Sequence, residues 1–215
     1  MSTRTTLIVT LAMVAIAVAF SAAVYGKLPE QMASHWNIND QVDGTMPRLW
    51  GAFLMPLVSL AMLGLFLLIP NIDPLKANIA KFRETFNAFI ALIVVFLLYT
   101  YFLTILWNLG YQNFRMGQAI LPAIGLIFIF AGLMMMKAKR NFFIGIRTPW
   151  TLSNDRVWDE THRVGSWLFI VMGVITMLTI FFGEIGIYIM MAALLIAVIV
   201  PVVYSYMLYK EETKG

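Results

Sequence analysis

The segment IGIYIMMAALLIAVIVPVVYSYMLY, residues Ile185–Tyr209, carries no charged side chain along its whole length. At about 1.5 Å per residue, a helix over this segment crosses the roughly 30 Å hydrocarbon core of a bilayer. Transmembrane strands alternate polar and apolar residues, and this segment does not. It therefore predicts a transmembrane helix, whose backbone satisfies its own hydrogen bonds in the absence of water.

Five further apolar blocks precede this segment, and each is long enough to cross a bilayer as a helix. They are Leu7–Val24, Leu49–Ile69, Ala88–Leu109, Met116–Met136 and Gly165–Phe182. The first block is longer than the apolar core of a signal peptide, so we interpret it as a retained membrane anchor. The sequence predicts an all-α integral membrane protein with six transmembrane helices.

The composition agrees with a membrane protein, since 61% of the residues are hydrophobic and only 12% are charged. Soluble domains average about 45–50% apolar and about 25% charged residues. The absence of cysteine excludes disulfides, thiolate metal sites and cysteine nucleophiles. The formal charge of +4 is here mainly a topology signal, and no basic aromatic pattern indicates direct nucleic-acid binding.

The distribution of lysine and arginine predicts the orientation. If the N-terminus is cytoplasmic, the outer segments carry only three cations, Lys27, Arg48 and Arg115. The inner segments then carry twelve, namely Arg4, Lys76, Lys81, Arg83, Lys137, Lys139, Arg140, Arg147, Arg156, Arg163, Lys210 and Lys214. Because cytoplasmic loops are enriched in Lys and Arg, we expect both termini to be cytoplasmic.

Two connections have predictable local structure. Asp73 and Pro74 suit an N-cap and a first helical position, so we expect a helix to start there and run on into the third span. Only Gly183 and Glu184 join the last two apolar blocks, which predicts a tight antiparallel hairpin of the fifth and sixth helices.

The inner segment Asn141–Arg163, NFFIGIRTPWTLSNDRVWDETHR, holds six of the chain's 26 charged side chains. Its first half has Arg147 as its one charge, so we expect it to lie in the membrane interface or to re-enter the bundle, with Trp150 at headgroup depth. Pro149 disfavours a helical conformation for Thr148, which is expected to be extended.

The second half of this segment predicts a helix with Ser153 or Asn154 as its N-cap. Two triplets with helical spacing occupy adjacent faces of that helix: Asp155, Asp159 and His162 on one, and Arg156, Glu160 and Arg163 on the other. The residues of the second triplet carry opposite charges and can pair as ions.

Two interpretations of this helix remain open. In the first, it is a juxtamembrane element stabilised by ion pairs and anchored by Trp158. In the second, it helps to form a polar ligand pocket at the inner face, enclosed by Arg147, Asp155, Asp159, His162 and Arg163. A single histidine without cysteine is a poor ligand set for a transition metal, so we predict no metal site and no cofactor. No nucleophile elbow surrounds Ser153, and the residues do not predict an enzyme.

The outer loop, residues 26–48, contains a second group of polar and aromatic residues. These are His35, Trp36 and Asn37, followed by the turn signal Asp43-Gly44. One interpretation is an interfacial loop that Trp36 anchors at the headgroups. The other is a ligand-facing patch in which His35 offers a polar surface and Trp36 a flat apolar one.

Both loops resemble known sequences. The run from Asn141 to Asn154, with Gly145, Arg147, Thr148, Pro149 and Trp150 inside it, together with Trp158, Thr161, His162 and Arg163, resembles the signature region of the SdpI-type immunity protein family. The outer residues Leu28, Pro29, His35, Trp36, Asn37, Asp43 and Gly44 resemble a domain of unknown function that is often fused ahead of it. The resemblance makes these residues the candidates for ligand or partner binding.

The resemblance implies a multi-pass protein of a prokaryotic plasma membrane that protects a toxin-producing cell from its own secreted peptide. It also implies that the protein can hold a transcriptional repressor at the membrane. The expected partners are thus the lipid bilayer, a peptide toxin on the outer face and a repressor on the cytoplasmic face.

On this basis the chain divides into a two-helix unit, 1–69, with the extracytoplasmic loop 26–48, and an SdpI-like four-helix unit, 70–215, with the cytoplasmic loop 137–164. The alternative function is binding of a lipid headgroup or small solute at the inner face, as in a carrier, a lipid-modifying enzyme or an accessory subunit.

Overall fold

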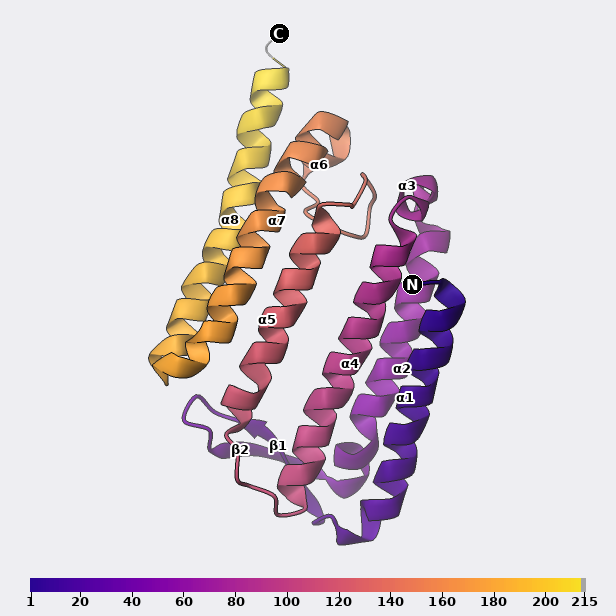
Figure 1. Cartoon of the computed structure of the whole chain (residues 1–215), viewed down its shortest axis with the longest axis vertical. Helices are drawn as coiled ribbons and strands as arrows, with labels where there is room; N and C mark the ends of the chain where they lie inside the picture. Colours follow the sequence, from indigo (N-terminus) through magenta and orange to yellow (C-terminus); the bar gives the residue numbers. More distant parts are fainter. Residues whose placement is uncertain (214–215) are drawn as a thin grey trace.

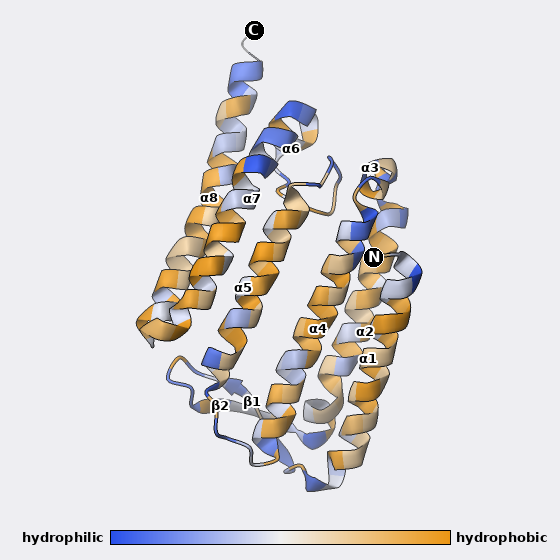
Figure 2. Ribbon diagram, viewed as in Figure 1, coloured by the Kyte–Doolittle hydropathy of each residue, from blue (hydrophilic) through white to orange (hydrophobic). Residues whose placement is uncertain are grey.

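The computed structural model describes residues 1–213, which form a bundle of long helices that run side by side (Figure 1). The six long helices are α1 Thr3–Val24, α2 Arg48–Ile72, α4 Arg83–Asn108, α5 Met116–Met135, α7 Asp155–Leu178 and α8 Ile185–Glu212. Each is long and apolar enough to cross a membrane. Figure 2 shows apolar residues along the middle of the bundle and hydrophilic residues gathered towards its two ends. The prediction of six transmembrane helices is confirmed.

Successive long helices run in opposite directions, so the beginning of α1 and the end of α8 lie at the same end of the bundle (Figure 1). We call this the loop end, because it also carries the connection from residue 137 to 148. The opposite end, where the two strands lie, is called the hairpin end. Lys214, counted among the twelve inner cations, lies outside the described residues.

The helices pack as two halves. Helices α1, α2 and α4 contact one another in the first half, and α7 packs against both α5 and α8 in the second. Helices α4 and α5 make the direct helix contact between the halves (Figure 1). The proposed division of the chain at residues 69 and 70 remains a prediction.

Two glycines allow α5 and α7 to approach closely. A Cβ atom on Gly125 would lie 2.6 Å from the carbonyl oxygen of Gly173, and a Cβ on Gly173 would lie 2.5 Å from the carbonyl oxygen of Gly125. Small residues at such positions let helix backbones meet in a membrane, where van der Waals packing replaces the hydrophobic effect as the driving force.

The predicted hairpin of the last two helices is confirmed. After α7 the chain passes through the short 3₁₀ helix η2, Thr179–Phe182, and turns at Gly183, whose φ of 56° suits glycine. At the other end of the pair, Arg156 of α7 forms an ion pair of 2.7 Å with Glu212 of α8. The two helices therefore contact each other at both ends.

The outer loop contains two β-strands, so the expectation of an all-α chain is wrong for this segment. After the short 3₁₀ helix η1, Tyr25–Lys27, it forms an antiparallel pair of strands, β1 Gln31–Trp36 and β2 Val42–Pro47. Gly44 does not form the turn but lies in β2 opposite His35, where a Cβ would come 2.9 Å from the His35 Cβ. It marks a close approach of two strands, which is another common use of glycine.

The predicted helix start at Asp73 is wrong. Helix α2 continues to Ile72, a short helix α3, Lys76–Ala80, follows, and α4 begins separately at Arg83. Asp73 instead holds a turn, because its Oδ1 accepts the backbone N–H of Leu75 at 2.6 Å.

The buried core differs between the two ends of the bundle. At the loop end, one cluster contains residues of both halves: Leu63, Ile69, Ile79, Phe82, Phe86, Ile90, Met134, Ala138, Ile144 and Trp158. At the hairpin end, the cluster comes from the first half: Val14, Ala17, Leu28, Met32, Ala52, Val94, Leu98, Tyr101 and Ile105. Within the described chain, the halves therefore share a core cluster at the loop end.

Candidate functional site

At the loop end, Asn141 fixes the start of the inner segment. Its side chain is fully buried, and its Nδ2 donates to the carbonyl oxygens of Lys139 at 2.8 Å and Ile144 at 3.0 Å. Its Oδ1 accepts the backbone N–H groups of Phe143 at 2.9 Å and Ile144 at 2.6 Å. Because every hydrogen-bonding group of this amide is used by the backbone of residues 139–144, Asn141 sets the shape of the loop.

His162 holds the middle of the segment against α7. Its Nε2 accepts the backbone N–H of Ile146 at 3.0 Å, and its Nδ1 lies 2.8 Å from the carbonyl oxygen of Trp158. The first bond requires an unprotonated Nε2 and the second a protonated Nδ1, so the ring is neutral and its tautomer is fixed. The imidazole stacks on the indole of Trp158 with centroids 4.0 Å apart.

Gly145 is required beside this histidine. Its φ is 108°, and a Cβ atom there would collide with Nε2 of His162. Trp158 is fully buried and donates from Nε1 to the carbonyl oxygen of Ala138 at 2.9 Å. The Gly145, Trp158 and His162 positions of the signature thus form one packed unit.

Thr148 begins the short helix α6, Pro149–Ser153, in the extended conformation predicted for the residue before a proline. Its hydroxyl accepts the backbone N–H of Thr151 at 3.1 Å, and the Thr151 hydroxyl accepts the backbone N–H of Thr148 at 2.9 Å. This reciprocal pair is a capping box. Thr148 Oγ1 also lies 3.1 Å from Ser205 Oγ, which connects the segment to α8.

Asn154 is the N-cap of α7, as predicted. Its Oδ1 accepts the backbone N–H groups of Arg156 at 2.8 Å and Val157 at 3.2 Å. Trp150 packs against Tyr206 of α8 with ring centroids 5.0 Å apart.

Most of the charged residues of the segment are engaged in ion pairs. Four ion pairs engage them: Arg140 with Asp155 at 2.7 Å, Lys139 with Asp159 at 3.1 Å, Arg163 with Glu160 at 2.5 Å, and Arg156 with Glu212 at 2.7 Å. Arg147 is paired with no carboxylate within the described part of the chain, and it donates to the carbonyl oxygen of Phe142 at 3.0 Å. Arg147 therefore has no ion-pair partner on α7, although one interpretation of the sequence groups it with Asp155 and Asp159.

Two contacts from the first half complete the inner segment. Asp73 Oδ2 accepts the backbone N–H of Phe142 at 2.9 Å, and Asn78 Nδ2 donates to the carbonyl oxygen of Arg140 at 2.9 Å. On this fixed backbone the side chains of Phe142, Phe143 and Arg147 are exposed. We call these three residues the loop patch.

At the hairpin end, the predicted outer residues shape a compact turn. Asn37 Oδ1 accepts the backbone N–H groups of Asn39 at 2.9 Å and Gln41 at 3.0 Å. His35 Nδ1 lies 2.5 Å from Asp43 Oδ1 at the surface. The Trp36 ring meets Trp107 edge to face, with centroids 5.6 Å apart.

The turn between the strands, residues 37–41, is called the hairpin tip. Asp40 in the tip has a φ of 63°, and its Oδ1 accepts the backbone N–H of Gly117 in the first turn of α5 at 3.0 Å. A carboxylate is favoured at a helix N-terminus. Asp40 therefore connects the hairpin, which belongs to the first half, to the second half.

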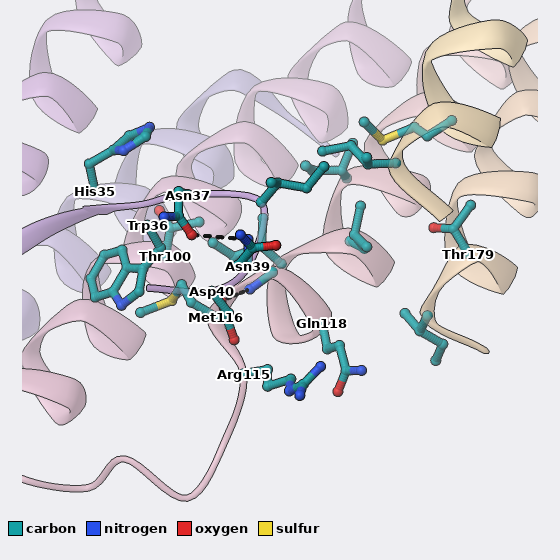
Figure 3. A pocket seen from close by; sticks show the side chains of 18 of the residues that line it. His35, Trp36, Asn37, Asn39, Asp40, Thr100, Arg115, Met116, Gln118 and Thr179 are labelled. Carbon is teal, nitrogen blue, oxygen red and sulfur yellow. Dashed lines mark hydrogen bonds between the residues drawn. The ribbon is translucent and has the colours of Figure 1, made fainter. Parts of the chain in front are cut away.

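A cleft of about 770 Å³ lies under the hairpin tip, between the two halves of the bundle (Figure 3). Its polar lining includes Ser34, His35, Asn37, Asn39, Asp40, Arg115, Gln118 and Glu184, with Thr100 and Thr104 further along α4. Its apolar lining includes Met55, Phe96, Leu97, Ile120, Leu121, Ile124, Ile187 and Met190. A concave, mainly apolar site with a few polar groups is the usual form of a ligand site.

Sequence reasoning found only part of this cleft. His35, Trp36 and Asn37 were predicted as a possible ligand-facing patch, and all three line it. Arg115 was recognised only as an outer charge, while Gln118 and Thr100 lie in apolar blocks, where no motif distinguishes them. Only the fold brings these residues together.

Comparison with known proteins gives two family matches and one full-length relative. Residues 137–205 match the SdpI/YfhL protein family, and residues 12–60 match a domain of unknown function, DUF1648. The chain is 29% identical over 205 residues to a protein named Immunity protein SdpI from Bacillus subtilis (strain 168), covering 95% of this chain and 96% of that protein. No solved structure matches the chain.

Proposed function

We propose that this multi-pass cell membrane protein, whose residues 137–205 match the SdpI/YfhL protein family, is an immunity protein that protects its cell against a secreted peptide toxin. The observation that carries this proposal is the full-length similarity to Immunity protein SdpI, which extends over nearly all of both chains. Because both loops are included in the aligned length, the similarity supports a common role better than a shared single domain would.

The proposed orientation places the hairpin end outside the cell. The loop end carries eleven of the cations within the described residues, whereas the hairpin end carries three, Lys27, Arg48 and Arg115. This asymmetry favours a cytoplasmic loop end. The cleft then opens on the side from which a secreted peptide arrives, and the loop patch faces the cytoplasm.

On the cytoplasmic side we propose that the loop patch binds a transcriptional repressor. Phe142, Phe143 and Arg147 combine apolar rings with a cation, and aromatic residues and arginine are enriched in protein interfaces. Asn141 and His162 fix the backbone beneath them, so little conformational entropy is lost when a partner binds.

A second candidate function is binding of a lipid headgroup at the same patch. It is favoured by the Arg147 guanidinium, which has no carboxylate partner in the described chain and matches a phosphate in geometry. In this case the exposed rings of Phe142 and Phe143 lie in the membrane interface.

The test of the immunity proposal is deletion of the gene, followed by challenge of the cells with the peptides they secrete. The expected result is loss of growth, restored by the wild-type gene. Unchanged growth of the deletion strain over the full range of secreted peptide concentrations overturns the proposal. Recovery of a repressor with membranes, only when toxin and wild-type protein are present, supports the role of the loop patch.

A further inference from the structure

The cleft offers two side-chain amides that have no internal role. Asn39 in the hairpin tip and Gln118 in α5 both line it, and neither side chain forms a hydrogen bond within residues 1–213. They come from the two halves of the protein, and Figure 3 shows Asn39 in the tip and Gln118 on the neighbouring α5. An amide side chain carries both donors and an acceptor, which is the combination that a peptide group needs.

Further from the tip, the cleft becomes apolar but keeps two acceptors. Thr100 and Thr104 donate their hydroxyl hydrogens to carbonyl oxygens of their own helix, at 2.9 Å and 3.0 Å. Their oxygen atoms retain free lone pairs beside apolar residues such as Phe96 and Ile124. A ligand that fits this arrangement is apolar in its side chains and carries N–H donors.

We propose that the cleft binds a short, uncharged, apolar segment of a peptide, with peptide groups hydrogen-bonded to Asn39 and Gln118 and apolar side chains packed between α4 and α5. This inference rests on the proposed function and names the part of a toxin that the protein recognises. The volume of about 770 Å³ lies within the roughly 300–1,000 Å³ of small-ligand sites, so the cleft holds a segment and not a folded domain.

The polar groups favour a peptide over a membrane lipid. The phosphate of a lipid headgroup only accepts hydrogen bonds and is best held by cationic donors, whereas Arg115 is the one lysine or arginine among the lining residues. Glu184, which also lines the cleft, repels a phosphate. An acyl chain makes no use of the threonine oxygens or the free amides.

The experiment uses the full chain in phospholipid nanodiscs and a short synthetic peptide of photoleucine and alanine with neutral, blocked ends. After illumination, mass spectrometry locates the crosslinked residues. We expect crosslinks on cleft residues such as Ile120, Ile124 and Ile187. A peptide that merely partitions into the bilayer labels lipid-facing residues such as Leu195, which is 58% exposed.

Two matched pairs of variants test the site itself. Thr100→Trp fills the cleft, whereas Val95→Trp places the same ring on the lipid-facing side of α4. We expect the first to reduce crosslinking by about tenfold or more and the second to leave it unchanged. Gln118→Leu removes an amide from the cleft and should weaken binding about 2–10-fold, while Gln112→Leu makes the same change outside it.

Labelling spread over the lipid-facing surface, or equal effects within each matched pair, overturns the proposal. Cleft occupancy by a phospholipid that the peptide cannot displace assigns the cleft to lipid and also overturns it. The immunity assay separates the two levels. If the Thr100→Trp variant still protects the cell, the immunity function stands but the cleft is not the toxin site. If the cleft binds the peptide but the protein gives no protection, only the immunity function is contradicted.

Discussion

Nε2 of His162 accepts the backbone N–H of Ile146 at 3.0 Å, and this bond holds the inner segment against the helix that follows it. The bond passes beside Gly145, where no Cβ atom fits. His162, which one interpretation of the sequence placed in a ligand pocket, thus positions the backbone of the inner segment. The exposed loop patch owes its fixed backbone to this buried contact.

The first prediction concerns Gly145. Gly145→Ala places a Cβ atom at a position with positive φ, where it collides with His162. We therefore expect the folded state to be destabilised by about 1–3 kcal/mol. The measurement is the thermal unfolding midpoint in nanodiscs. Gly64→Ala is the control, because nothing lies within 4 Å of a Cβ there and alanine favours a helix. Equal midpoints for the two variants would contradict the prediction.

The second prediction concerns the bond between Asp40 and the N-terminus of α5. Asp40→Ala removes the acceptor for the Gly117 N–H, whereas Asp40→Asn keeps an acceptor and tolerates a positive φ. We expect hydrogen exchange at the Gly117 amide to accelerate strongly in the alanine variant and only slightly in the asparagine variant. Exchange that is the same in wild type and Asp40→Ala would show that the hairpin tip is held by other contacts.

The transmembrane helices were predictable because hydropathy is a local property, and each block specifies its own helix. The strands were not, because six residues around a bulge give a weak pattern and Asp43-Gly44 resembles a turn. The true turn depends on Asp40, whose partner Gly117 lies 77 residues away. One interpretation of the sequence groups Arg147 with Asp155, but Arg140 forms the ion pair with that carboxylate. Competition between two arginines for one carboxylate depends on the fold and cannot be predicted from the spacing of residues in the sequence.

The third prediction is the orientation of the bundle. The chain has no cysteine, so single cysteines at Gln41 and Asn154 can be labelled without a background. Because the cations gather at the loop end, we expect an impermeant maleimide to label Gln41→Cys on intact cells and Asn154→Cys only after lysis. Labelling of both positions on intact cells would refute the proposed topology.

The fourth prediction separates stability from binding at Arg147. Its guanidinium is exposed and donates to a single carbonyl oxygen, that of Phe142, so neither Arg147→Lys nor Arg147→Ala should change the free energy of unfolding by more than about 0.5 kcal/mol. A desolvated ion pair would have cost about 3–5 kcal/mol on removal of one partner. Thermal unfolding in nanodiscs distinguishes these values.

Binding at the loop patch should respond differently from stability. Arginine offers a planar pair of donors to a carboxylate or phosphate, whereas lysine offers a point charge. We therefore expect Arg147→Lys to reduce the toxin-dependent recovery of the repressor with membranes nearly as much as Arg147→Ala, although both accumulate normally. Lys139→Ala removes a cation of the same end whose ion pair with Asp159 is exposed, and it should retain repressor recovery. Full repressor recovery with Arg147→Lys would mean that the positive charge serves only the orientation of the chain, for which lysine is as good as arginine.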